Sequence, residues 1–213
     1  MSRWSVGLKY AGAVIAALAA MASPASGASG GGCELQGTAS FSPGLSSTAQ
    51  DFAYSFAGSL TSCQSSVAGS PTSGTVEAGK TVTMQVTNSI TGATDTVTYQ
   101  EPVPTGNGSC GSSTTSGIAV VRWADGTVTV VDYATTGAAA AVNLSGTVVN
   151  SVTLTATNAQ AGDPTTQTIT TTRYAGSEAL GALAFQPPDP TACTGAGVSE
   201  AGISGFIGLG SSA

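Results

Sequence analysis

The sequence contains no histidine, and only 8% of its 213 residues are charged. Without histidine, the chain cannot form a Ser-His-Asp or Cys-His catalytic unit, and it has no imidazole to ligate a metal. Its four cysteines include no CxxC motif. We therefore expect a protein without a metal, without a cofactor and without enzymatic activity.

Positive charge is scarce beyond the first 28 residues. There, Lys80, Arg122 and Arg173 stand against eleven acidic residues, a net charge of −8. Such a chain is repelled by nucleic acid and by anionic membrane surfaces, so we expect neither as a partner. Serine, threonine, glycine and alanine replace the charged residues, which predicts a surface of hydroxyl and amide groups.

The first 28 residues have the three regions of a secretory signal peptide. Arg3 and Lys9 precede an apolar run at 11–22, and small residues follow it. An apolar helix of about 12 residues is roughly 18 Å long, which is short of the ~30 Å hydrocarbon core, so the run favours a cleaved leader over an anchor. We expect cleavage near Ala25 or Ala28 and a protein that is secreted, extracellular or loosely associated with the cell envelope.

Four cysteines in an exported chain indicate two disulfides. Of the three possible pairings, we expect Cys33 with Cys63 and Cys110 with Cys193. Cys33 begins one expected strand and Cys63 ends the next, so antiparallel pairing brings them together. That register sets Leu35 opposite a threonine, a mismatch that a β-bulge in either strand would repair.

Apolar and polar residues alternate through most of the chain. Residues 51–60 place Phe52, Tyr54 and Phe56 on one face and small residues on the other, which is typical of a half-buried strand. Roughly ten to twelve such segments, without a helical pattern, predict an all-β fold: an antiparallel β-sandwich or barrel, with an immunoglobulin-like form among the sandwiches.

The expected domain follows the leader and covers residues 29–213. Two β halves, near 33–105 and 106–213, are the alternative. The proline-rich segments at 101–111 and 187–190 are expected to be connections, because proline has no donor for a strand ladder.

Two hairpins can be aligned from the pattern alone. In 81–100, a two-residue loop at Thr91-Gly92 would place Val86 opposite Val97. In 117–137, a type I′ turn at Asp125-Gly126 would place Trp123 opposite Val128. A three-residue turn with a bulge at Gly126 is the alternative for the second hairpin, and it would place Trp123 opposite Thr127.

The leader, followed by a Gly-rich, Thr-rich and cysteine-bearing β chain, resembles the small exported proteins of high-GC Gram-positive (actinobacterial) bacteria. Many of those proteins have no assigned function, so the resemblance implies a compartment rather than a chemistry. The Asp-Gly hairpin is also similar to those of immunoglobulin-like sandwiches. However, Trp123 lies between Cys110 and Cys193 with a spacing that departs from the Cys-Trp-Cys framework of those domains.

Few residues suggest chemistry. Glu77, Glu101, Asp125 and Asp132 could in principle form the carboxylate pair of a glycosidase, although an Asp-Gly turn already explains Asp125. The glycine-flanked Ser109 has no base beside it.

Trp123 is the one speculative ligand-binding residue. An exposed Trp123 would suit a sugar ring or a partner protein, whereas alternation places the ring in the core, as we expect. The sequence therefore predicts a secreted, non-enzymatic structural or binding protein of the envelope or extracellular space, with an envelope glycan or protein as its partner. A carbohydrate-binding module is the alternative, and a carboxylate-based glycosidase a remote one.

Overall fold

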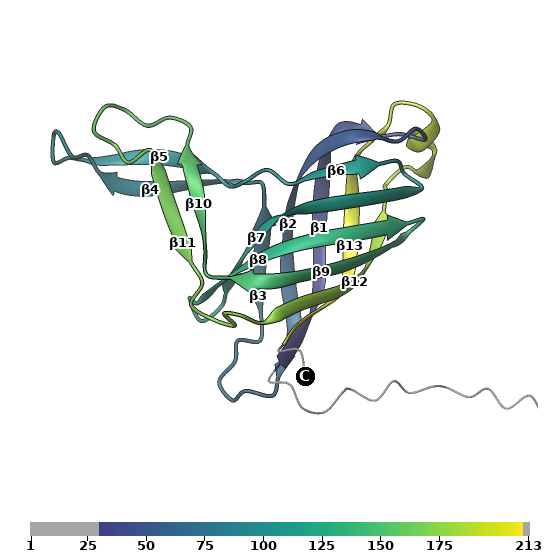
Figure 1. The fold of residues 1–213 in the computed structure, drawn as a ribbon, viewed down its shortest axis with the longest axis horizontal. Helices are drawn as coiled ribbons and strands as arrows, with labels where there is room; N and C mark the ends of the chain where they lie inside the picture. The colour runs from purple at the N-terminus through teal and green to yellow at the C-terminus, as the bar shows by residue number, and fades with distance from the viewer. Residues whose placement is uncertain (1–29, 211–213) are drawn as a thin grey trace, which may run out of the picture.

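A computed structural model describes residues 30–210 as thirteen β-strands and one short 3₁₀ helix, which confirms the all-β prediction (Figure 1). The expected signal peptide and its cleavage sites lie outside these residues. The first sheet consists of β1 (Gly30–Leu45), β2 (Gln50–Ser65), β3 (Gly74–Ala78), β6 (Thr105–Gly108), β7 (Ser112–Trp123), β8 (Val128–Ala138), β9 (Ala141–Val149), β12 (Glu178–Gln186) and β13 (Val198–Gly210). The second sheet consists of β4 (Thr81–Thr87), β5 (Thr94–Gln100), β10 (Ser151–Ala156) and β11 (Thr166–Thr170). The helix is η1 (Pro190–Thr194). No helix within 30–210 is long and apolar enough to cross a membrane.

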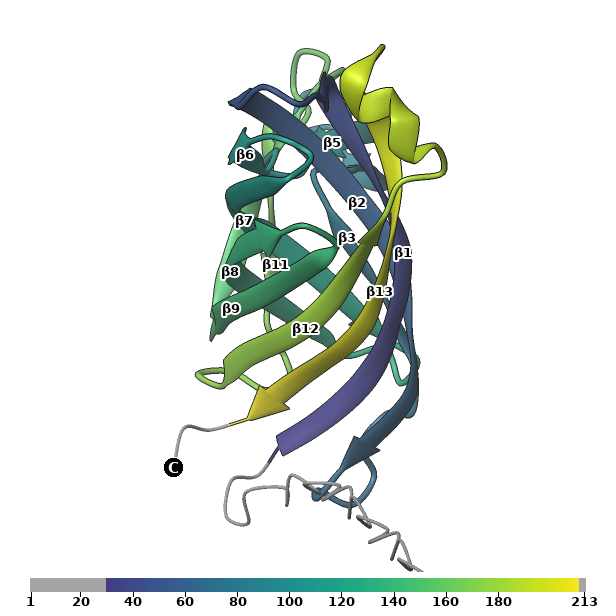
Figure 2. The same ribbon diagram turned by 90° about the vertical axis from the view of Figure 1, so that its right-hand side faces the viewer.

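The first sheet closes into an antiparallel barrel, because β1 pairs with β2 on one side and with β13 on the other. From β7 to β13, each strand of this sheet pairs with the next one of the same sheet along the chain, so that β9 pairs with β12. Figure 2 shows the strands crossing the barrel at a tilt. Of the two architectures that the sequence predicted, the structure has the barrel, and the immunoglobulin-like sandwich is not formed.

One of the eight barrel positions is shared by two short strands. β3 pairs with the later part of β2, and β6 pairs with its earlier part. Both also pair with β7, so they act as two halves of a single barrel strand. The chain leaves the barrel between them, over residues 79–104, to form β4 and β5. The prediction that 101–111 is only a connection was therefore wrong at β6, where the strand follows the prolines, whereas 187–190 contains no strand.

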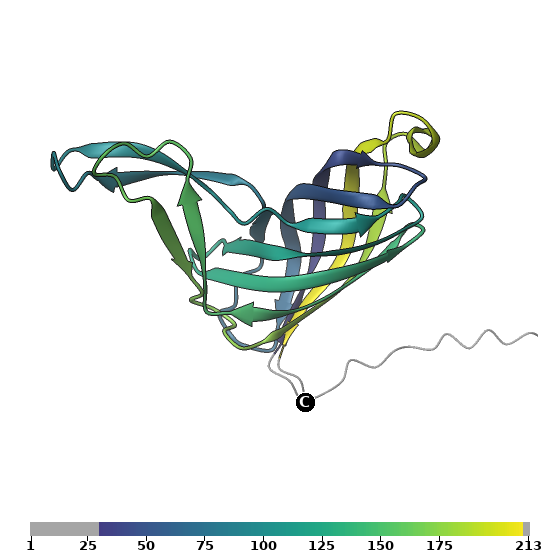
Figure 3. The same ribbon diagram turned by 45° about the horizontal axis from the view of Figure 1, so that its top comes forward.

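The second sheet is built from two hairpins inserted into the barrel sequence. β4 and β5 are inserted between β3 and β6, while β10 and β11 are inserted between β9 and β12. Antiparallel pairing of β5 with β10 joins them, and Figures 1 and 3 show the resulting sheet on one side of the barrel. Its apolar face packs against Val120 and Val130, which point outward from β7 and β8 and are at most 1% exposed.

The 117–137 hairpin adopts the alternative register. Trp123 N donates to Thr127 O (2.9 Å), and Val121 lies opposite Thr129 rather than Val130. The expected type I′ register was wrong: such a turn needs positive φ at both Asp125 and Gly126, and of these two residues only Gly126 has it (φ +83°), in a longer turn. The predicted register paired Val121 with Val130, valine with valine. This criterion failed because both faces of the hairpin are buried, one in the barrel and one under the second sheet.

The 81–100 hairpin has the expected faces but a different register. Val86 lies opposite Asp95 and Met84 opposite Val97, two residues away from the predicted alignment. The loop is longer than two residues because the Asn88 side chain organises it: Asn88 Oδ1 accepts hydrogen bonds from the backbone N–H groups of Ile90 and Thr91.

Both disulfides form as predicted, Cys33–Cys63 and Cys110–Cys193. The expected bulge lies in β2 at Ser62, whose φ is 52°. It shifts the register so that Leu35 faces Leu60, which restores apolar contact inside the barrel. Two disulfides are typical of proteins from an oxidising compartment.

Candidate functional site

The inward faces of the barrel strands surround an apolar cavity of about 160 Å³. Alternation along each strand brings one set of side chains to the interior. All eight barrel positions contribute, as shown by Leu35, Leu60, Val76, Val121, Val131, Leu144, Leu183 and Ile207. The cavity is therefore a property of the whole barrel.

Several side chains that point into the barrel are only partly buried. Tyr54, Phe56, Leu144 and Ile207 pack against the core and line the cavity, yet each keeps some accessible surface. Because these side chains face the interior, the accessible surface is space that the core leaves unfilled. The barrel interior thus differs from the core under the second sheet, where Val97, Tyr99 and Leu154 have no exposure.

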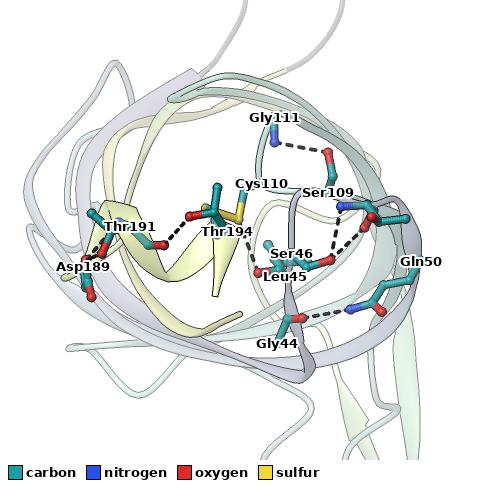
Figure 4. Close-up of a disulfide and its surroundings, with 12 residues drawn as sticks. Gly44, Leu45, Ser46, Gln50, Ser109, Cys110, Gly111, Asp189, Thr191 and Thr194 are labelled. Atoms are coloured by element: carbon teal, nitrogen blue, oxygen red, sulfur yellow. Dashed lines mark hydrogen bonds between the residues drawn. A yellow bond between two sulfur atoms is a disulfide. The ribbon is translucent and has the colours of Figure 1, made fainter. Parts of the chain in front are cut away.

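Over one end of the barrel lie η1 and the Cys110–Cys193 disulfide. Figure 4 shows the helix lying across the outline of the barrel, with Cys110 beside Leu45. Ala192 and Cys193 pack against a small core that includes Leu45 and Phe52. Asp189 caps the helix by accepting a hydrogen bond from Thr191 N (2.9 Å). This end is held by a covalent bond as well as by packing.

At the opposite end the cavity lining becomes more polar. Gln64, Ser65 and Pro71 line it there, together with Gly31, where β1 begins and β2 ends. The Cys33–Cys63 disulfide lies beside them and also lines the cavity. The two disulfides therefore fix opposite ends of the barrel.

Four hydroxyl groups form a continuous chain on the cavity wall, which we call the hydroxyl chain. It runs from Tyr133 to Tyr54 (2.6 Å), then to Thr115 (3.1 Å) and Thr135 (2.7 Å). β2, β7 and β8 supply these residues, and all four line the cavity. The chain places a polar strip along a wall that is otherwise apolar.

Burial sets the chemistry of the hydroxyl chain. Desolvation raises the pKa of both Tyr133 and Tyr54 above the ordinary phenol value of 10.0, so both phenols stay protonated and can donate. Within the described part of the chain, no charged side chain lines the cavity. The interior is thus a neutral, apolar space with a few hydrogen-bonding groups.

Trp123 lies inside the barrel, which confirms its predicted burial. It is 6% exposed and lines the cavity. Its indole Nε1 donates to Thr129 Oγ1 (2.8 Å), and its ring packs edge-on against Tyr174. Trp123 therefore presents no exposed platform to a sugar, although it borders the cavity.

Two of the candidate carboxylates lie together where the chain leaves the barrel. Glu101 is 1% exposed, and its Oε2 accepts from Lys80 N (3.1 Å) while its Oε1 has no partner within the described residues. Burial raises the pKa of Glu101, and the nearby Glu77 adds to this shift. Arg122 Nη2 is also buried without a partner among these residues. This cluster lies outside the cavity wall.

The other candidates have structural roles or lie on the surface. Asp125 accepts hydrogen bonds from Thr127 N and Oγ1 in the turn, which hold its pKa below the ordinary value, and its carboxylate pairs with Arg173 (2.9 Å). Asp132 is exposed on the outer face of β8. Ser109 Oγ accepts from Gly111 N, across Cys110.

The hydroxyl chain was not predicted from the sequence. Alternation had already placed Tyr54 on the apolar face of its strand. The predicted register, with Trp123 opposite Val128, would put Tyr133 on the other face of the hairpin from Trp123, and this was wrong. With the observed register, Tyr133 and Thr135 face inward from β8, opposite Gly117 and Thr115. Inward-facing hydroxyls on paired strands were the signal that could have predicted the chain.

Comparison with known proteins finds no matching family model, no match among curated proteins and no match among solved structures.

Proposed function

We propose that this is an exported, non-enzymatic binding protein whose barrel encloses a small apolar molecule. The observation that carries the proposal is the cavity of about 160 Å³, walled by side chains from all eight barrel positions. Eight-stranded barrels have an interior that is either just filled by side chains or able to hold one small ligand. This barrel leaves space, and the space is apolar.

The size and polarity of the cavity define the ligand. An apolar cavity of about 150 Å³ inside a protein stays free of water and can bind a single-ring molecule such as benzene. Burial of apolar surface stabilises such a complex by about 25 cal/mol per Å². A neutral molecule with about one six-membered ring fits both the volume and the walls.

Export and a binding role fit the remaining features. Two disulfides, an acidic net charge and the leader-like first 28 residues support a place in the extracellular space or envelope. Trp123 offers no surface for a sugar, so the carbohydrate-binding hypothesis gains no support from that residue. Retention of a small apolar molecule outside the cell is the activity that we infer.

Trp123 provides a direct test, because it lines the cavity and is the only tryptophan after residue 28. We expect its fluorescence to change in a saturable way when the purified protein is titrated with benzene, toluene or methylcyclohexane. Absence of saturable binding across ring-sized hydrocarbons would contradict the proposal.

A matched pair of variants separates binding in the cavity from binding elsewhere. Ala119→Leu adds three carbon atoms to the cavity wall, whereas Ala182→Leu adds them to the exposed outer face of β12. We expect the first variant to bind weakly and the second to bind like the wild type. Overpacking costs about 1–3 kcal/mol, so urea unfolding must first show that both variants are folded. Equal binding by the two variants would place the ligand outside the barrel.

A further inference from the structure

From the hydroxyl chain, we infer that the ligand of the barrel is neutral and carries one hydrogen-bond acceptor, of the kind that a ketone oxygen provides. The inference rests on the proposed function, because it specifies the chemistry of the molecule in the same cavity. The volume alone selects by size, and the hydroxyl chain adds a polar contact at a fixed place on the wall.

The number of protons in the hydroxyl chain leaves one donor free. Each of the four hydroxyl groups has one proton to donate, and the three bonds of the chain use three of them. Within residues 30–210, these four oxygen atoms make no other hydrogen bond. One O–H therefore lacks an acceptor, whichever way the protons in the chain are arranged.

A free donor favours a ligand that can accept from it. Buried donors without an acceptor are rarer in proteins than oxygen atoms with an unused lone pair, because an unmade hydrogen bond of a buried donor costs free energy. A hydrocarbon would leave the O–H unused, whereas a carbonyl oxygen would accept it. Both tyrosines remain protonated, so no phenolate competes with the ligand as an acceptor.

The walls exclude a charged head group. No charged residue of the described chain lines the cavity, so a carboxylate or ammonium group would lose its hydration without gaining an ion pair. Glu101 and Arg122, which have unpartnered atoms, do not line it either. The hydrogen-bonding group of the ligand is therefore uncharged.

Two probes of nearly equal shape test the inference. Cyclohexanone carries C=O where methylenecyclohexane carries C=CH₂, and both contain one six-membered ring. Their dissociation constants are measured by calorimetry on the wild type and on two double variants, Tyr54→Phe/Tyr133→Phe and Thr115→Val/Thr135→Val. The control is Thr114→Val/Thr136→Val, a pair that faces the other way on the same two strands and is likewise directly opposed.

The ratio of the two dissociation constants in the wild type, divided by the same ratio in a variant, cancels the different cost of removing each probe from water. We expect the wild type to prefer cyclohexanone over methylenecyclohexane. In at least one of the two cavity variants this preference should fall about fivefold, because that is the effect of losing one hydrogen bond. The Thr114/Thr136 control should leave the preference unchanged.

The outcomes distinguish the inference from the proposed function. If methylenecyclohexane binds and the ketone preference is the same in the wild type and both cavity variants, the inference is overturned while the cavity remains a binding site. If neither probe binds to the wild type, the proposed function fails as well. Should a double variant not fold, the four single changes Tyr54→Phe, Tyr133→Phe, Thr115→Val and Thr135→Val replace it. An unchanged preference in all four overturns the inference.

Discussion

The inward-facing hydroxyl of Thr129 should be worth a large part of the stability of the barrel. Thr129 is fully buried; its Oγ1 accepts from Trp123 Nε1 (2.8 Å) and donates to the carbonyl of Arg173 (3.0 Å). The change Thr129→Val keeps the shape of the side chain but removes both bonds. It would leave one buried donor and one carbonyl without a partner.

The magnitude follows from those two groups. The buried indole N–H left without an acceptor costs about 1–3 kcal/mol, and loss of the part-buried bond to the carbonyl of Arg173 adds about 0.5–1.5 kcal/mol. We therefore expect Thr129→Val to lower the free energy of unfolding by about 1.5–4.5 kcal/mol. That is a substantial part of the roughly 5–15 kcal/mol that stabilises an ordinary domain. Thr129→Ser keeps the hydroxyl and removes one methyl group, at a cost of about 1 kcal/mol.

Urea unfolding followed by Trp123 fluorescence measures these differences directly, since the reporter is itself the donor. The order of stability should be wild type, then Thr129→Ser, then Thr129→Val. A valine variant as stable as the serine variant would refute the reasoning, because it would show that the two hydrogen bonds contribute nothing beyond the shape of the side chain.

The remaining predictions concern the disulfides and Glu101. Replacing both cysteines of a disulfide with alanine should lower the free energy of unfolding by about 3.5 kcal/mol for Cys33–Cys63, which are 30 residues apart, and by about 4.5 kcal/mol for Cys110–Cys193, which are 83 apart. Urea unfolding measures both losses. A smaller loss for the longer loop would contradict the chain-entropy reasoning. Burial raises the pKa of Glu101, so the folded state favours the protonated carboxyl. Its contribution is complete below the ordinary pKa of 4.5 and is lost as the pH rises through the raised pKa. The stability of the wild type relative to Glu101→Gln should therefore fall as the pH rises above about 4.5, and a difference that does not vary with pH would be inconsistent with this shift.

Local patterns in the sequence predicted the parts of the fold that depend on pairs of neighbouring strands. The Cys33–Cys63 pairing followed from the places of the two cysteines at the start and the end of adjacent strands. The mismatch that it left predicted a bulge in one of the two strands, because a single residue out of phase moves every later side chain to the other face. The inward face of β2, with Phe52, Tyr54 and Phe56, was likewise visible in the alternation. These predictions needed no knowledge of the rest of the molecule.

The two hairpin registers depended on contacts from outside each hairpin. Asn88 extends the loop of the 81–100 hairpin, and its Nδ2 donates to Asp163 (2.8 Å) in the loop between β10 and β11. In the 117–137 hairpin, the outward Val120 and Val130 are covered by the second sheet. Alternation cannot show which of two apolar faces is the interior of the barrel, so the register with the best valine pairs was preferred and was wrong.

The split barrel strand could not be predicted for a similar reason. β3 and β6 are short, separated by residues 79–104, and each alone has too few alternating residues to indicate a strand. They become one barrel position only because both lie between β2 and β7. The inserted hairpins have the same period-two pattern as the barrel strands, and nothing local assigns them to a second sheet.

The size of the cavity depends on the summed volumes of all the inward-facing side chains of the barrel. The alternation pattern therefore gave no sign of it. The pattern shows which residues face inward, but the space left inside depends on the volumes of all of them together. Some inward positions are glycines: the ring of Phe56 lies where side chains at Gly37 and Gly58 would be, with its Cζ 2.5 Å and 2.8 Å from their hypothetical Cβ atoms. One aromatic ring thus occupies space that three side chains would otherwise share. A barrel that is wide enough for eight strands but lined partly by glycine, alanine and threonine leaves room in its interior, and in an apolar interior a small molecule can fill that room better than water.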